Sequence, residues 1–176
     1  TAQTALCGIV LHPAGHTKSP LMHNAAFLEM DIDARYVAFD VPPEKLPEAI
    51  AGVRALGLKQ LAVSVPHKVE VMALLDEVDA GAQQIGAVNT VTLRDGRLVG
   101  SNTDWVGSNQ ALERETTLAG KRAVVLGAGG AARGVVFGLL ERGATVHVLN
   151  RTVEKAETLV KDLGAESAES DINWVG

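Results

Sequence analysis

Several features that mark particular classes of protein are scarce in this chain of 176 residues. Aromatic residues make up only 3% of it, which argues against the base-stacking surfaces that bind single-stranded nucleic acid. The net charge of −5 gives no reason to expect nucleic acid or an anionic membrane as a partner. The single cysteine, Cys7, excludes an intrachain disulfide and suits a reducing compartment, so we expect a cytoplasmic protein.

Long hydrophobic runs are absent as well, because the longest ones have only the length of a strand. No membrane span is therefore predicted. No signal peptide precedes Leu6, and the start at Thr1 without a methionine indicates a trimmed N-terminus. Hydrophobic residues still make up 47% of the chain, which is enough for a packed globular core.

Strand-like and helix-like segments alternate along the chain. Apolar residues at spacings of three and four, as in Leu46, Ile50 and Val53, indicate amphipathic helices, whereas short apolar runs indicate buried strands. This alternation predicts an α/β fold with a mainly parallel sheet. We expect strands at 6–10, 36–39, 61–65, 88–93 and 97–100, with a hairpin turn at 95–96, and helices at 20–30, 46–56, 69–75, 80–85 and 105–115.

A glycine-rich turn in the C-terminal half is the most specific single signal. It lies between a predicted strand and a predicted helix, and a second strand ends about twenty residues further on. Gly127 permits a tight turn, Gly129 lets the backbone approach a pyrophosphate, and Ala132 keeps the helix close to the sheet. The pattern predicts a dinucleotide site rather than a turn that only packs a helix on a sheet. The turn consists of Gly127, Ala128, Gly129, Gly130, Ala131 and Ala132.

The end of the second strand indicates which dinucleotide is bound. Asn150, Arg151 and Thr152 offer an amide, a guanidinium and a hydroxyl, but no carboxylate for a ribose 2′-hydroxyl. A guanidinium binds phosphate through two parallel hydrogen bonds, so we predict NADP. The alternative is that Arg151 is merely a solvated residue at a strand end.

These signals divide the chain into an N-terminal catalytic domain at 1–104 and a Rossmann-type domain at 105–176. The residues after Leu149 suffice for one helix and one short strand.

Polar clusters in the N-terminal half follow the predicted strands, where parallel sheets bind ligands. Thr17 and Ser19 are two residues apart, so an extended backbone turns both hydroxyls the same way. With the helix N-terminus that follows, they suit a small carboxylate. The alternative is that Ser19 only caps this helix ahead of Pro20.

Two further clusters contain Ser64 with Lys68, and Asn89 with Asp104. Taken alone, Lys68 is a solvated lysine and Asp104 an N-cap of the next helix. Together they fit the reduction of a ketone, in which Lys68 donates a proton to oxygen, Asp104 holds the ammonium, and a nicotinamide supplies the hydride. Ser64, Asn89 and Asp104 would then bind substrate hydroxyls.

Six short strings carry a resemblance to one family. They read His-Thr-Lys-Ser-Pro-Leu-Met-His-Asn, Ser-Val-Pro-His-Lys, Ile-Gly-Ala-Val-Asn-Thr, Asn-Thr-Asp, Gly-Ala-Gly-Gly-Ala-Ala-Arg and Asn-Arg-Thr. Their order and spacing resemble shikimate dehydrogenases and make the match far more specific than any one string. The resemblance implies a cytosolic, NADP-dependent enzyme that reversibly reduces 3-dehydroshikimate to shikimate on the chorismate route to aromatic amino acids.

The resemblance also assigns roles to residues. Lys68 and Asp104 match the catalytic pair, Thr17 and Ser19 the carboxylate-binding hydroxyls, Ser64 and Asn89 further substrate contacts, 127–132 the phosphate turn, and 150–152 the 2′-phosphate site. It implies a small-molecule substrate, a monomer or homodimer, and no metal site.

Some residues depart from the family pattern. Thr17 stands where Ser is common, Ser64 where Thr is usual, and Trp105 where Gly is common. Quinate or an amino analogue of dehydroshikimate therefore stays open as a substrate. Family members extend over a second half of the nucleotide domain, so the resemblance implies a chain truncated at its C-terminal end, with only the N-terminal portion of that domain. A non-catalytic module that binds ligands of this pathway is therefore a further alternative.

Overall fold

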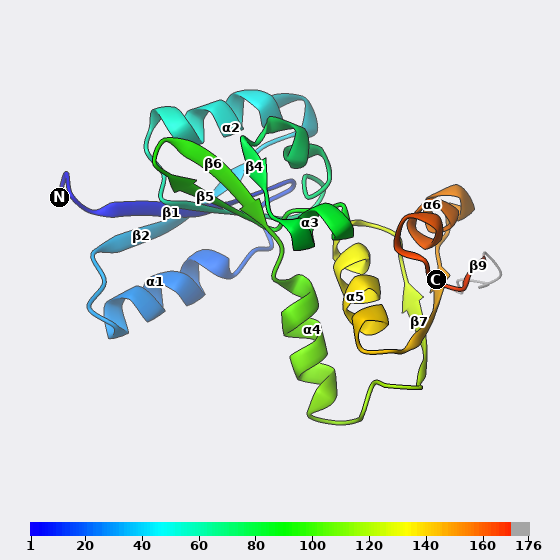
Figure 1. Ribbon diagram of the computed structural model, residues 1–176. Helices are drawn as coiled ribbons and strands as arrows, with labels where there is room; N and C mark the ends of the chain where they lie inside the picture. Colours follow the sequence, from blue (N-terminus) through cyan, green and yellow to red (C-terminus); the bar gives the residue numbers. More distant parts are fainter. Residues whose placement is uncertain (170–176) are drawn as a thin grey trace. The chain divides into compact units, whose positions relative to one another are not determined.

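The computed structural model describes residues 1–169, which form two compact units (Figure 1). The first unit consists of Thr1–Ala82 with Val88–Ser101, and the second of Gln83–Ala87 with the chain from Asn102 onward. The chain therefore passes from one unit to the other three times. The domain limit after residue 104 stays a prediction.

The first unit contains a six-stranded sheet with the strand order β2-β1-β3-β5-β6-β4. Strand β1 pairs in parallel with β2 and β3, and β4 pairs in parallel with β6, whereas β5 is antiparallel to both its neighbours. The strands are β1 (Ala5–Leu11), β2 (Ala34–Asp40), β3 (Gln60–Val63), β4 (Glu77–Val78), β5 (Thr90–Arg94) and β6 (Arg97–Ser101).

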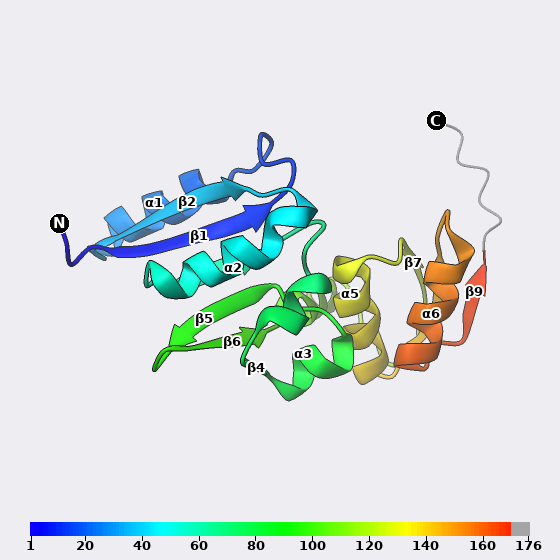
Figure 2. The same ribbon diagram turned by 90° about the horizontal axis from the view of Figure 1, so that it is seen from above.

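Helices α1 (Ser19–Glu29) and α2 (Leu46–Ala55) cover opposite faces of this sheet (Figure 2). Successive strand residues point to opposite faces, so Val10 packs in the core beneath α2, whereas Ile9 belongs to the smaller core that includes Phe27 of α1. The remaining helical segments in this part of the chain are two 3₁₀ turns, Pro43–Lys45 and Glu70–Leu74, and helix α3 (Ala80–Ile85).

Three sequence-based expectations need correction here. Strand β3 ends at Val63 rather than residue 65, because the chain turns at Val65-Pro66. The helix expected at 69–75 is a 3₁₀ helix at Glu70–Leu74. Strand β4 was not expected, since two residues are too few to show a periodic pattern.

The second unit contains a three-stranded parallel sheet with the order β7-β8-β9. Its core joins Val146 and Val148 of the middle strand to Leu139 and Leu159 of two helices. The elements are α4 (Asp104–Glu113), β7 (Arg122–Leu126), α5 (Gly130–Glu141), β8 (Thr145–Leu149), α6 (Val153–Leu163) and β9 (Ser167–Glu169). The predicted strand–turn–helix–strand unit and the α/β fold with mainly parallel pairing are confirmed.

Candidate functional site

The carboxyl ends of β1 and β3 meet at one edge of the first sheet, because the two strands are parallel. Just beyond β1, the Thr17 and Ser19 hydroxyl oxygens lie 3.3 Å apart, and both residues are half-buried. Thr17 Oγ1 also accepts a hydrogen bond of 3.3 Å from the Ser19 N–H. The two hydroxyls therefore lie next to each other, but the expected extended backbone is wrong, since Lys18 between them is in the α region (φ −103°, ψ −1°).

Ser19 does not cap the helix, because it is the first residue of α1 and Lys18 is the N-cap. The N-cap position carries no side-chain hydrogen bond. The capping alternative for Ser19 is therefore wrong, and its hydroxyl pairs with Thr17 instead.

Beyond the end of β3, a tight turn holds Ser64 and Lys68. The Ser64 N–H donates to the Val10 carbonyl (3.0 Å), and the Ser64 carbonyl accepts from the His67 N–H (2.9 Å). His67 is 1% exposed, and its Nε2 lies 2.8 Å from the Val41 carbonyl. This buried histidine fixes the backbone immediately before Lys68, a role that the sequence analysis did not assign.

Asn89 is fastened to the same edge by backbone hydrogen bonds. Its carbonyl accepts from the Val63 N–H (2.7 Å), and its N–H donates to the Ser101 carbonyl (3.0 Å). One residue earlier, the Val88 N–H donates to the Lys68 carbonyl (2.8 Å). The structure thus brings the backbones of Ser64, Lys68 and Asn89 together within the first unit.

A histidine and an aspartate form a hydrogen-bonded pair at the same sheet edge. His12 Nδ1 and Asp40 Oδ1 are 2.8 Å apart at the ends of β1 and β2. The hydrogen bond from His12, assisted by one from the Ala14 backbone, lowers the pKa of the Asp40 carboxyl. Asp40 therefore stays ionised at neutral pH beside this edge.

Asp104 belongs to the second unit, where it is the first residue of α4. The N-cap is Thr103, so the alternative role of Asp104 as an N-cap is wrong. The Asp104 N–H donates to Asn102 Oδ1 (2.9 Å). Because Lys68 lies in the first unit, the pairing of Lys68 with Asp104 stays a prediction.

The glycine turn has the backbone that a phosphate site requires. Gly127 has a φ of +109°, which side chains rarely adopt, and its N–H donates to the Leu149 carbonyl (2.7 Å). At Gly129 the backbone is extended, and a Cβ would meet nothing within 4 Å. Helix α5 starts at Gly130, so its first N–H groups lack intrahelical acceptors. These features fit a pyrophosphate.

Asn150, Arg151 and Thr152 follow the end of β8, next to the glycine turn, since Leu149 pairs with Leu126. Asn150 Nδ2 donates to the Thr152 carbonyl (2.6 Å), and Thr152 is the N-cap of α6. Arg151 is exposed. An exposed guanidinium beside an ordered turn and a helix N-terminus fits a second phosphate group.

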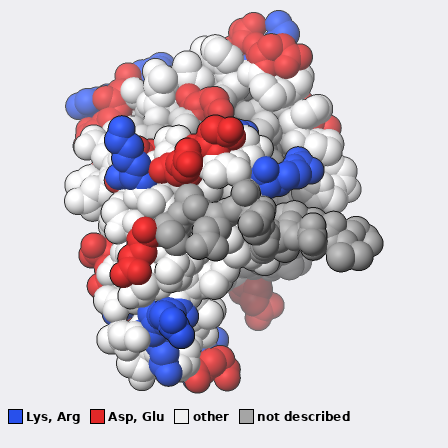
Figure 3. Space-filling model, turned by 90° about the vertical axis from the view of Figure 1, so that its right-hand side faces the viewer, with Lys and Arg blue, Asp and Glu red and all other residues white. Residues whose placement is uncertain are grey.

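Three further observations concern the part of the chain that the structure describes. No group of three or more His, Cys, Asp or Glu side chains there suits a metal ion, and no helix is long and apolar enough to cross a membrane. On the face drawn in Figure 3, acidic and basic side chains of the described residues are interspersed rather than gathered by sign.

Comparison with known proteins gives matches over most of the chain. Residues 9–91 match the family model of the shikimate dehydrogenase substrate-binding domain, and residues 109–173 match that of shikimate / quinate 5-dehydrogenase. A shikimate dehydrogenase (NADP(+)) of Geobacillus kaustophilus is 54% identical over 158 residues, which are 88% of this chain and 57% of the relative.

Solved structures agree with these sequence matches. Shikimate dehydrogenase from Aquifex aeolicus has a TM-score of 0.92 and 42% identity, and the match covers 97% of this chain and 64% of that one. The Thermus thermophilus enzyme, in complex with NADP(H) and shikimate, has a TM-score of 0.85 and 39% identity over 94% of this chain and 63% of that one. The chain thus spans about 57% of a curated relative's length.

Proposed function

The chain belongs to the shikimate dehydrogenase family, and we propose that it carries the substrate site and the NADP phosphate site of an enzyme that reversibly reduces 3-dehydroshikimate to shikimate. The observation that carries this proposal is the gathering of Ser64, Lys68 and Asn89 at one sheet edge by backbone hydrogen bonds. A hydroxyl, an ammonium and an amide at one edge suit a substrate rich in hydroxyl groups.

Thr17 and Ser19 bind the substrate carboxylate in this proposal. Their hydroxyl oxygens lie 3.3 Å apart, with the Thr17 hydroxyl donating to Ser19 Oγ. A bound carboxylate would replace Ser19 Oγ as the acceptor for Thr17 and accept from the Ser19 hydroxyl as well. Ser64 and Asn89 bind ring hydroxyls, and a ring without those hydroxyls would leave these polar groups unpaired. The first unit therefore selects the substrate.

Lys68 donates the proton to the substrate oxygen during ketone reduction and takes it back in the reverse direction. An ammonium is charged at neutral pH, and a neighbouring carboxylate favours that charged form. Asp104 is the carboxylate that we assign to this role. Proton donation by Lys68 balances the negative charge that reduction places on the oxygen.

Residues 127–132 hold the pyrophosphate of NADP, and residues 150–152 hold its 2′-phosphate. The open space at Gly129 and the exposed guanidinium of Arg151 support these two assignments. When bound, NADPH supplies the hydride. The residues of this chain contribute binding of the phosphates and orientation of the adenosine half.

The direct test measures NADPH formation from shikimate and NADP⁺. We expect Lys68→Ala to lower kcat by about 10²- to 10⁴-fold with a much smaller effect on KM. Lys59→Ala is the matched control, since Lys59 is an exposed lysine of the same unit outside the site. Equal changes in kcat and KM for Lys68→Ala, or equal effects of both variants, would refute the proton-donor role.

A second candidate is a module that binds these ligands without catalysis. Calorimetry with shikimate, quinate and NADP⁺ distinguishes the candidates. Shikimate affinity without turnover and with little NADP⁺ affinity would establish the module, and tighter binding and faster turnover of quinate would establish the other substrate.

We also propose a cytoplasmic protein that is a monomer or homodimer. The lone Cys7 is half-buried and is a free thiol, which suits a reducing compartment. Light scattering at several protein concentrations measures the oligomeric state. A tetramer or larger assembly would refute this part of the proposal.

A further inference from the structure

Arg133 is an unusually buried arginine in the second unit. It is the fourth residue of α5 and follows the phosphate turn directly. Its side chain is 13% exposed, whereas that of Arg142 at the other end of the same helix is 41% exposed. Burying a guanidinium is unfavourable unless its N–H groups find partners, so its partners define what this residue does.

Both ends of the Arg133 guanidinium are occupied. Nη1 donates to the Ile85 carbonyl (3.1 Å), and Nη2 pairs with the Asp162 carboxylate on α6. The side chain therefore joins α5 to α6 and to the end of α3. These partners hold the guanidinium in a single arrangement.

Gly86 makes room for this arrangement. Its φ is +70°, and a Cβ there would lie only 2.8 Å from Arg133 Nη1. A side chain at this position would both strain the backbone and displace the guanidinium. The turn at 85–86 and Arg133 are thus shaped to fit one another.

The buried turn continues through a hydrogen-bonded chain to Asp104. The Ala87 carbonyl accepts from Asn102 Nδ2 (2.9 Å), and Asn102 Oδ1 accepts from the Asp104 N–H (2.9 Å). Asn102 is 6% exposed, and Ile85 and Ala87 are completely buried. The link from Asn102 to Ala87 is therefore shielded from water, which strengthens it and makes its loss costly, and the link to Asp104 is partly buried.

From these contacts we propose that Arg133 is a positioning residue, which fixes the 85–87 turn to the phosphate-binding helix so that Asn102 holds the Asp104 backbone in place. The inference rests on the proposed function, in which Asp104 is a catalytic carboxylate. In this proposal Arg133 is connected to Asp104 through the 85–87 turn and Asn102, all within the second unit.

This role differs from phosphate binding. Because the guanidinium is engaged by Asp162 and Ile85, Arg133 is not the cation that binds NADP in this arrangement. Replacing it should leave NADP⁺ affinity nearly unchanged and lower the rate, since a misplaced catalytic group costs rate rather than binding.

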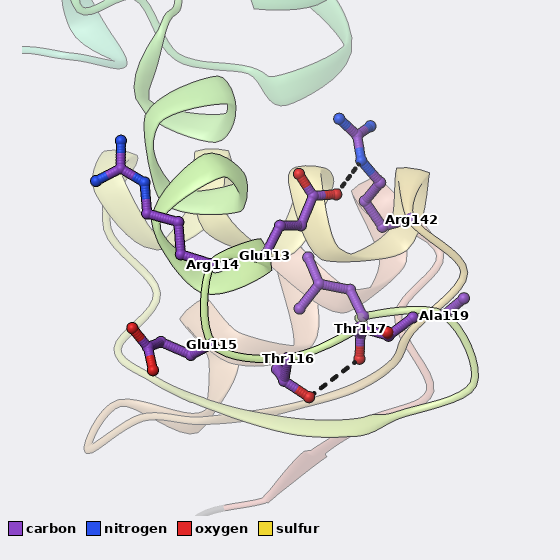
Figure 4. A pocket seen from close by; sticks show the side chains of 8 residues that line it. Glu113, Arg114, Glu115, Thr116, Thr117, Ala119 and Arg142 are labelled. Carbon is purple, nitrogen blue, oxygen red and sulfur yellow. Dashed lines mark hydrogen bonds and ion pairs between the residues drawn. The ribbon is translucent and has the colours of Figure 1, made fainter.

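The test compares Arg133→Met, Gly86→Ala and the control Arg142→Met. Methionine keeps an unbranched apolar stem without the guanidinium, and Gly86→Ala leaves Arg133 present but blocks its place. Arg142 pairs with Glu113 at 2.7 Å beside the pocket after α4 and is outside the proposed site (Figure 4). Arg133→Lys tests rescue, since a single ammonium cannot reproduce the two-sided fork.

We expect Arg133→Met and Gly86→Ala each to lower kcat by about 10- to 100-fold. The Kd for NADP⁺ and the KM for shikimate should change by less than about threefold, which corresponds to under 1 kcal/mol. Arg133→Lys should recover only part of the rate, and Arg142→Met should match the wild type. A large rise in Kd for NADP⁺ would instead make Arg133 a phosphate ligand. Lower thermal stability with unchanged kcat would make it purely structural.

Hydrogen exchange of the Asp104 amide provides a readout that needs no reaction. We expect this amide to exchange faster in Arg133→Met and Gly86→Ala than in the wild type and Arg142→Met. Unchanged exchange would overturn the positioning role, even in a protein inactive on shikimate. If the Asp104 amide exchanges faster in both variants but the wild-type protein does not oxidise shikimate, only the proposed function is refuted.

Discussion

The two sheets differ in how completely their strands are covered. In the first unit β3 lies between β1 and β5, and Leu61 and Val63 are each 2% exposed. In the second unit β7 is an edge strand, and its Val124 and Leu126 are 60% and 58% exposed. Within the described residues, the first sheet therefore buries its central strand β3, whereas the second sheet leaves an apolar face of its edge strand β7 exposed.

This difference follows from how each sheet is built. A doubly wound nucleotide-binding sheet places its first strand in the middle, with further strands beyond it. Among the described residues, β7 bears the glycine turn, and β8 and β9 lie on one side of it. A groove lined by Leu112, Leu118, Val124 and Leu126 runs along β7. The cofactor turn itself is nevertheless formed, because it depends on β7, α5 and β8 alone.

The largest expected effect compares two leucines on strands. Leu61→Ala should lower the free energy of unfolding by about 2–5 kcal/mol, because it leaves a cavity in a closed core. Leu126→Ala should cost less than about 1 kcal/mol, since Leu126 already contacts water. Urea denaturation measures both. Similar losses would show that β7 is covered in solution, for instance by another copy of the chain.

A pair of glycines separates packing from ligand binding. A Cβ at Gly8 would lie 2.5 Å from the Phe39 ring and 2.7 Å from the Val37 carbonyl, so Gly8→Ala should cost about 1–3 kcal/mol of stability. A Cβ at Gly129 meets nothing, so Gly129→Ala should leave stability within about 0.5 kcal/mol of the wild type.

For NADP⁺ affinity the order of the two glycine variants is reversed, and Gly129→Ala has the larger effect. Because Gly129 is where the backbone approaches the pyrophosphate, Gly129→Ala should weaken NADP⁺ binding about tenfold or more, as measured by calorimetry. The folded fraction of Gly8→Ala should keep wild-type affinity. Loss of affinity in Gly8→Ala alone would contradict this division.

Acid should weaken the first unit through Asp76. A hydrogen bond from the Leu98 N–H, followed by the Arg54 guanidinium, lowers the pKa of the Asp76 carboxyl. The stabilisation is therefore complete above the unfolded-state pKa of about 4 and is lost as the pH falls through the lower folded-state value. Asp76→Asn should flatten the acid limb of a stability–pH curve. An unchanged acid limb would show that Asp76 does not contribute to the loss of stability in acid.

The smallest effect concerns a buried hydroxyl. Tyr36 Oη is buried and has no hydrogen-bond partner among the described residues, and burial raises the pKa of Tyr36 to about 12. Tyr36→Phe should stay within about 1 kcal/mol of the wild type near neutral pH. It should also remove the stability loss expected as the pH rises above about 10 toward 12. A loss of several kcal/mol would reveal a partner for this hydroxyl.

Much of this organisation could be predicted from local patterns. The glycine turn is visible because only glycine suits a φ of +109° at position 127, and the strand and helix around it have clear periods. The pair Thr17 and Ser19 shows a limit of such patterns, because Lys18 between them has helical backbone angles and the alternation of an extended strand does not apply. Strand β4 and the buried contacts of His67 and Arg133 depend on distant chain segments, so no local pattern indicates them.

The central claim is that shikimate binds near Thr17, Ser64 and Asn89, and that the phosphates of NADP⁺ bind at residues 127–132 and 150–152. Amide chemical shifts of the 176-residue chain can be recorded during separate titrations with shikimate and NADP⁺. We predict that shikimate shifts the amides near Thr17, Ser64 and Asn89, and that NADP⁺ shifts those of residues 127–132 and 150–152. Shifts of residues 127–132 and 150–152 by shikimate, or no shifts from either ligand, would contradict the proposed sites.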